Sequence, residues 1–144
     1  MNDYNRQVNA DFIRHLESAD PVNERINLLM SHIVNAHQIW LERMRGERMS
    51  VKVFELRTYE QLSNQIEKNH KDTAGILESK SLDEAVNYVN TQRQRFRNTI
   101  AEMFLHLFNH SSYHRGQINQ LLVQEGKQAM VSDFIVYSRT EIFE

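Results

Sequence analysis

The stretch Phe104–Leu122 reads FLHLFNHSSYHRGQINQLL and decides the fold. It carries three histidines at successive four-residue steps, His106, His110 and His114. Residues four apart lie on one face of an α-helix. At about 100° per residue, that face also carries apolar side chains, namely Met103, Leu107 and Leu121. The pattern therefore predicts a long helix that turns imidazoles toward the core of a helix bundle.

Two inward imidazoles one turn apart, such as His110 and His114, can bind one transition-metal ion at about 2.0–2.1 Å. A single inward histidine is more often a core residue with satisfied ring nitrogens. A pair is harder to bury without a shared partner, because several polar nitrogens then need hydrogen bonds. The spacing alone leaves both alternatives open. Ser111 follows His110 where an H-E-x-x-H metalloprotease has its catalytic glutamate.

Composition limits the classes of protein. The length of 144 residues suits one domain with a sizeable core. A net charge of −2 gives no basic field for nucleic acid. We expect no membrane span, because no apolar run reaches about 18 residues, and a cytoplasmic location, because no secretory pattern opens the chain. The chain has no cysteine, so His, Asp or Glu must hold any metal.

Four long helices are predicted from apolar spacing, at about residues 3–19, 21–45, 58–79 and 99–124. Asp20 is the expected N-cap of the second helix, with Pro21 in its first turn. Gly46 and Gly126 are expected to end the second and last helices. One proline and four glycines in the whole chain also favour helices over a turn-rich β fold.

Two segments leave alternatives open. Ser81 and Glu84 have the spacing of a capping box that would begin another helix. Alternating Val86, Tyr88 and Phe96 instead favour a short β-hairpin, which we prefer. Residues 47–57 form a connection, and residues 133–137 in the C-terminal tail 130–144 could be a short helix or an extended arm.

The second helix carries two more histidines. If Ile33 is set at zero, His37 falls near +40° and His32 near −100°. His37 is then central to the apolar face and His32 lies at its edge. This geometry mildly favours His37 as a buried ligand and does not exclude His32.

The segment NHSSYHRGQ, Asn109–Gln117, resembles the signature of the DinB family, the DinB/YfiT-like metalloenzyme fold. Residues 30–43, MSHIVNAHQIWLER, are similar to the second-helix pattern of that family. Residues 86–88 and the segment after them resemble its hairpin. The resemblance covers about residues 20–140. Two segments depart from the family pattern. No proline lies between Gly126 and Asp133, in the segment of the pocket lid. The hairpin turn Asn90–Arg93 lacks the glycine that is frequent in the family.

The resemblance implies an all-α four-helix bundle for the single domain 1–144, commonly a homodimer. It also implies one divalent metal per chain, nickel or zinc, held by His32, His110 and His114. The family ligand of the second helix matches His32, against the preference for His37 from helix geometry. The remaining candidates near the metal or pocket are His37, His106, Asn109, Tyr113 and Gln117.

Three neutral imidazoles leave coordination positions open, as a catalytic site requires. An open position could acidify water or take a substrate thiolate, and relatives in the wider superfamily are thiol-dependent transferases. We therefore expect a metal-dependent enzyme of hydrolase or thiol S-transferase type that acts on a small molecule or thiol. The alternatives are a non-catalytic bundle that binds metal or a small ligand in a stress response, and a purely structural module. We interpret Arg115 as part of an ion pair and Trp40 as core or dimer packing.

Overall fold

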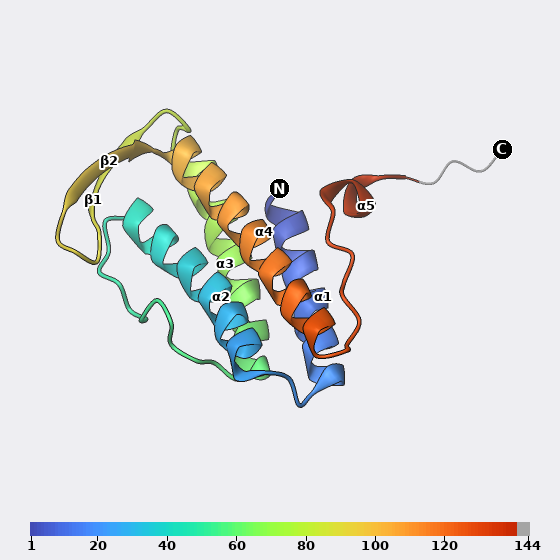
Figure 1. Ribbon diagram of the computed structural model, residues 1–144. Helices are drawn as coiled ribbons and strands as arrows, with labels where there is room; N and C mark the ends of the chain where they lie inside the picture. The colour runs from blue at the N-terminus through green and yellow to red at the C-terminus, as the bar shows by residue number, and fades with distance from the viewer. Residues whose placement is uncertain (141–144) are drawn as a thin grey trace.

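The computed structural model describes residues 1–140, so the last four residues of the predicted domain and tail lie outside the described residues. The chain forms an all-α bundle with a β-hairpin before the last long helix, as predicted (Figure 1). The long helices are α1 (Asn2–Ala19), α2 (Glu24–Met44), α3 (Tyr59–Ser79) and α4 (Ile100–Gln124). The hairpin consists of β1 (Ala85–Val89) and β2 (Arg95–Thr99), and a short α5 spans Phe134–Ser138.

The four long helices share one apolar core. Phe12 and Leu16 of α1, Met30 of α2, Leu62 of α3 and Ile118 of α4 are all buried in it. Full burial of one such side chain contributes about 1.5–3 kcal/mol. A second cluster lies at the hairpin end and includes Leu41, Met44, Val86, Ile100 and Met103. The two clusters place α2 against α4, the pair of helices that carries the candidate ligands.

Helix ends follow local sequence in most places. Thr58 and Thr99 each begin a helix with a full capping box, α3 and α4 respectively. Gly46 and Gly126 follow α2 and α4 at φ values of +71° and +72°, which glycine adopts without strain. The prediction of Asp20 as a cap is wrong. The helix α2 begins at Glu24, and Asn23 caps it by accepting a hydrogen bond from the Arg25 backbone.

The hairpin prediction is confirmed. The strands β1 and β2 are antiparallel, with Val86 opposite Asn98 and Tyr88 opposite Phe96. The turn contains Arg93 at φ 64°, a left-handed conformation that glycine adopts more easily. Arg93 is thus a non-glycine residue in the left-handed region, within the turn Asn90–Arg93 for which the resemblance implied a glycine.

The tail returns along α1 (Figure 1). The Tyr4 hydroxyl donates to the Ser132 carbonyl, and the Tyr137 hydroxyl donates to Asp11 at 2.8 Å. The ring of Tyr4 packs edge-on against Phe134 at 5.2 Å. Of the two alternatives for residues 133–137, the structure shows the short helix, α5, beginning one residue later.

Candidate metal centre

Three imidazoles converge between α2 and α4. The Nε2 atom of His110 lies 2.9 Å from Nε2 of His32 and 3.1 Å from Nε2 of His114. One ligand atom from each ring lies within 4.8 Å of the others. Three nitrogens bound tetrahedrally at about 2.0–2.1 Å would be separated by about 3.3 Å. The two spacings to His110 are within about 0.4 Å of that value.

Hydrogen bonds to the outer nitrogens fix the tautomers of two rings. The Nδ1 atom of His32 faces the Val53 carbonyl at 3.2 Å, and Nδ1 of His114 faces Oε1 of Gln117 at 2.7 Å. Both oxygens only accept, so both Nδ1 atoms carry the proton. The Nε2 atoms of His32 and His114 in their neutral forms therefore present lone pairs toward His110.

A single ring nitrogen cannot satisfy two neighbouring lone pairs. The Nε2 atom of His110 has either one proton or one lone pair. It can therefore form a true hydrogen bond with only one of His32 and His114. A cation placed between the three nitrogens accepts all three lone pairs at once, so the donor set fits a divalent transition metal.

Burial favours the neutral forms of His110 and His32. Burial, followed by the nearby His114, His32 and His106, lowers the pKa of His110 to about 3. Burial likewise lowers the pKa of His32, opposed by the hydrogen bond to Val53. Neutral imidazole is the form that binds metal, so the centre can bind near neutral pH without first releasing protons.

The connection after α2 holds His32 in place. Asn35 donates from Nδ2 to the Glu55 carbonyl at 2.8 Å and, at 3.5 Å, to the Val53 carbonyl that orients His32. Arg57 donates to Oδ1 of Asn35 at 2.6 Å, which fixes the amide in turn. Outer hydrogen bonds of this kind set the orientation of ligands in metal sites. The roles of Asn35 and Arg57 were missed from the sequence, because they depend on how the connection folds back.

Aromatic side chains flank the centre. Phe54 stacks on the His32 ring at 4.3 Å, and Tyr113 packs edge-on against the His114 ring at 5.1 Å. Both side chains are mostly open to solvent, at 56% and 65% exposed. Exposed aromatic residues beside a polar centre provide apolar contact area for a ligand. Tyr113 was a sequence candidate, whereas Phe54 stands in the connection and was not.

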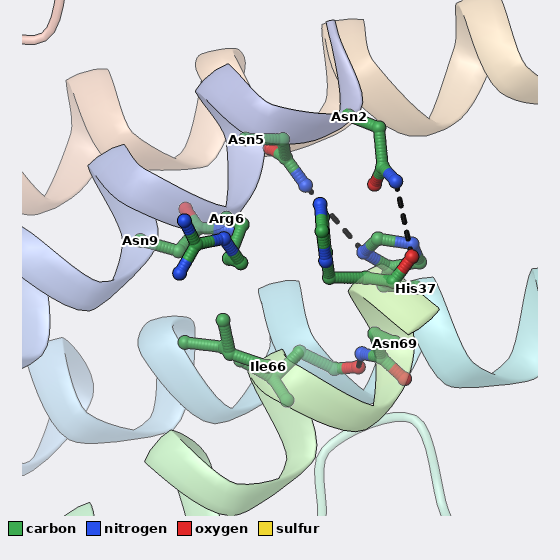
Figure 2. Close-up of a pocket in the computed structure, with 9 residues that line it drawn as sticks. Asn2, Asn5, Arg6, Asn9, His37, Ile66 and Asn69 are labelled. Atoms are coloured by element: carbon green, nitrogen blue, oxygen red, sulfur yellow. Dashed lines mark hydrogen bonds between the residues drawn. The ribbon is translucent and has the colours of Figure 1, made fainter. Parts of the chain in front are cut away.

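The structure places His37 away from the three convergent rings. It lies between α1, α2 and α3, where Asn5 points toward its ring (Figure 2). Its Nδ1 accepts from Asn5 at 3.4 Å, and its Nε2 donates to Thr73 at 2.9 Å. Both nitrogens are thus satisfied without a metal, and burial lowers the pKa of His37 to about 3. The adjoining cavity of about 10 Å³ has room for about one water molecule.

The other candidates on α4 have separate positions. The ring of His106 lies 5.6 Å from that of His110, one turn toward the hairpin. Asn109 is exposed beside the centre. The Arg115 side chain is buried and donates to the amide oxygens of Asn5 and Asn9. Among the described residues it has no carboxylate partner, so interhelical hydrogen bonds replace the expected ion pair.

The model of the DinB family matches residues 4–142. The chain belongs to the DinB family. No curated protein and no solved structure matches it significantly. Within residues 1–140 of this DinB protein, no helix combines the length and apolar character that a membrane span needs.

Proposed function

We propose that this DinB protein is a metal-dependent enzyme in which His32, His110 and His114 hold one zinc or nickel ion. The observation that carries the proposal is the convergence of three Nε2 atoms, two of which have lone pairs fixed by outer hydrogen bonds. Three neutral ligands leave a fourth position for substrate or water, as in catalytic sites. The metal would act there as a Lewis acid that favours thiolate or hydroxide over thiol or water.

Of the two reaction types, we favour thiol S-transfer over hydrolysis. The cluster of potential ligand atoms in the described residues consists of the three histidines alone, with no carboxylate. Attack by water is usually assisted by a positioned general base, such as a carboxylate. A thiol needs less help, because its ordinary pKa of about 8.5 is already close to neutral pH. Phe54 and Tyr113 would provide the apolar contact for the electrophilic partner.

The test compares two reactions catalysed by the metal-loaded protein. One is transfer of low-molecular-weight thiols to 1-chloro-2,4-dinitrobenzene, in which a C–S bond forms and chloride leaves. The other is hydrolysis of 4-nitrophenyl acetate. We expect thiol transfer that is lost on chelation, returns with zinc or nickel and is absent in His110→Ala. Bound metal without turnover in either reaction would instead support the non-catalytic alternative, a metal- or ligand-binding protein.

A further inference from the structure

A row of side chains leads from the candidate metal centre toward the hairpin. The His106 ring lies 5.6 Å from the His110 ring, and the Trp40 ring lies 4.9 Å from His106. The guanidinium of Arg43 follows, 4.6 Å from the Trp40 ring. These residues lie on α2 and α4, whose neighbouring ends meet the hairpin in Figure 1. The row therefore ends at a cation on the same side of the bundle as the three histidines.

Arg43 lies against two aromatic rings and, among the described residues, has no carboxylate partner and no acceptor at its Nε. Its guanidinium carbon lies 4.6 Å from the Trp40 ring and 5.3 Å from the Tyr88 ring. Its Nε atom is buried without a hydrogen-bond partner. Within residues 1–140, no carboxylate forms an ion pair with it. A desolvated donor without an acceptor is unfavourable, so the guanidinium is suited to an acceptor from outside the chain.

Other partly or fully buried arginines have partners. Arg45 pairs with Glu47 at 2.9 Å and with Asp72 at 3.3 Å. Arg57 and Arg115 donate to side-chain amide oxygens. Arg115 also lies over an aromatic ring, 5.4 Å from that of Tyr4, but it has its two asparagine acceptors. Arg43 differs from these three, because no carboxylate within residues 1–140 pairs with it and its Nε has no acceptor there.

A carboxylate suits such a group. The planar fork of a guanidinium matches the two oxygens of a carboxylate. One guanidinium balances the single charge of a carboxylate, and partial burial strengthens the attraction. Arg43 lies eleven residues after His32, which is roughly 16 Å along the helix. An extended ligand could therefore reach the metal with one end and Arg43 with the other.

We propose that Arg43, Trp40, Tyr88 and His106 form a subsite for the carboxylate of an elongated substrate whose opposite end reaches the metal. The carboxylate binds the free edge of Arg43, and the aliphatic part lies against Trp40 and His106. The metal end of this assignment rests on the proposed function. The carboxylate end rests on Arg43 and can be tested in the metal-free protein.

The test uses the fluorescence of Trp40, the one tryptophan of the chain. Metal-free protein is titrated with octanoate and with octan-1-ol, which share an eight-carbon chain. We expect a saturable change with octanoate and roughly tenfold weaker binding of the alcohol, as expected when a charge-assisted hydrogen bond is lost. Arg43→Gln should remove the preference, and Arg48→Gln, at an exposed position, should retain it. Circular dichroism checks that both variants fold.

Three results would overturn the subsite. They are equal binding of acid and alcohol by the unaltered protein, no saturable change with octanoate, and an undiminished preference in Arg43→Gln. The first two need no variant and so hold even if Arg43→Gln does not fold. A concentration-dependent dimer lost in Arg43→Gln, together with no octanoate binding, would instead assign Arg43 to contact with a second copy.

A second titration separates this proposal from the proposed function. Zinc-treated protein is titrated with 8-mercaptooctanoate, which adds a thiolate to the same acid. Tighter binding of 8-mercaptooctanoate than of octanoate supports both the thiolate contact at the metal and the carboxylate contact at Arg43. Octanoate binding without any gain from the thiol would contradict the metal end and leave the Arg43 subsite standing.

Discussion

The histidines of the candidate centre depend on neighbouring residues for their orientation. The Val53 carbonyl and the Gln117 amide oxygen accept hydrogen bonds from the outer nitrogens of His32 and His114, so the inner nitrogens face one point. Val53 is itself held by Asn35, which Arg57 fixes from the other side. The position of the His32 ring is therefore set by residues that do not touch the metal position.

Replacing Asn35 should weaken metal binding without removing a ligand. Asn35→Ala frees the Val53 carbonyl and removes one of the amide acceptors of Arg57, whose bond to Gln38 remains. We expect zinc affinity to fall by about 10- to 100-fold, as is typical when residues behind metal ligands are changed. Competition with a chromophoric chelator measures this change. Asn64→Ala, on the exposed face of α3, is the control and should bind as the unaltered protein does. Equal affinities in all three proteins would show that the connection does not orient His32.

Residue patterns predicted one half of the candidate centre better than the other. The four-residue step of His110 and His114 places both on one face, because they share a helix. The choice between His32 and His37 depends on which neighbouring helix each side chain faces. The sequence of α2 alone does not specify its neighbours. His32 faces α4, and His37 faces α1 and α3. Resemblance to DinB proteins favoured His32 where helix geometry mildly favoured His37.

At the scale of elements, α4 positions two of the three histidines. Its start is defined by Thr99, whose hydroxyl accepts from the Glu102 backbone at 3.2 Å. The Glu102 carboxylate accepts from the Thr99 backbone at 2.8 Å in return. These bonds satisfy two backbone donors at the junction of hairpin and helix.

Loss of this cap should reduce stability and leave the metal centre intact. Thr99→Ala removes the side-chain acceptor, which costs about 1 kcal/mol. For a domain of this size, we expect the melting temperature to fall by about 3 °C. Thermal unfolding followed by circular dichroism measures the shift, with Thr91→Ala in the exposed turn as control. An unchanged melting temperature in Thr99→Ala would contradict the capping role.

The ends of helices were predictable where the residues that define them are close together in the sequence. The capping residues and the terminal glycines of α2 and α4 lie next to the turns that they form. Residues 47–57 were predicted only as a connection, without its contacts to α2. Those contacts are hydrogen bonds of Asn35 with Glu55 and Arg57, which join residues about 20 positions apart in the sequence. Asp20 was assigned wrongly as a cap, because α2 begins after Asn23 instead of at Pro21.

At the scale of the whole molecule, the bundle buries polar groups in addition to its apolar core. Asn5 and Asn9 of α1 bind Arg115 of α4, and Asn5 also faces His37 of α2. These contacts join three helices. Because His37 is buried in the neutral form, the stability of the fold should depend on pH.

Acid should destabilise the protein partly through His37. Its pKa is lowered from 6.5 to about 3 in the folded state, so below pH 6.5 the unfolded chain binds a proton that the folded chain does not. Stability therefore falls as pH falls from 6.5 toward 3, by about 1.4 kcal/mol per pH unit for one proton. Above pH 6.5, His37 contributes no pH dependence.

Urea unfolding of metal-free protein between pH 7 and pH 5 tests this prediction. His37→Gln retains a side chain that can hydrogen-bond Asn5 and Thr73 but cannot titrate. The free energy of unfolding should decline less steeply with acid in this variant, by about 2 kcal/mol over the range. His110 and the other histidines are common to both proteins, so the difference isolates His37. Parallel pH profiles would contradict the prediction.

The most direct measurement is the metal content of tag-free protein after incubation with zinc and dialysis. We predict about one zinc per chain, lost in His32→Ala and His110→Ala. His37→Gln on α2 and His106→Ala on α4 are the matched controls and should retain the metal, because neither ring joins the convergent three. No zinc or nickel in the unaltered protein, or equal metal in all four variants, would contradict the three-histidine centre.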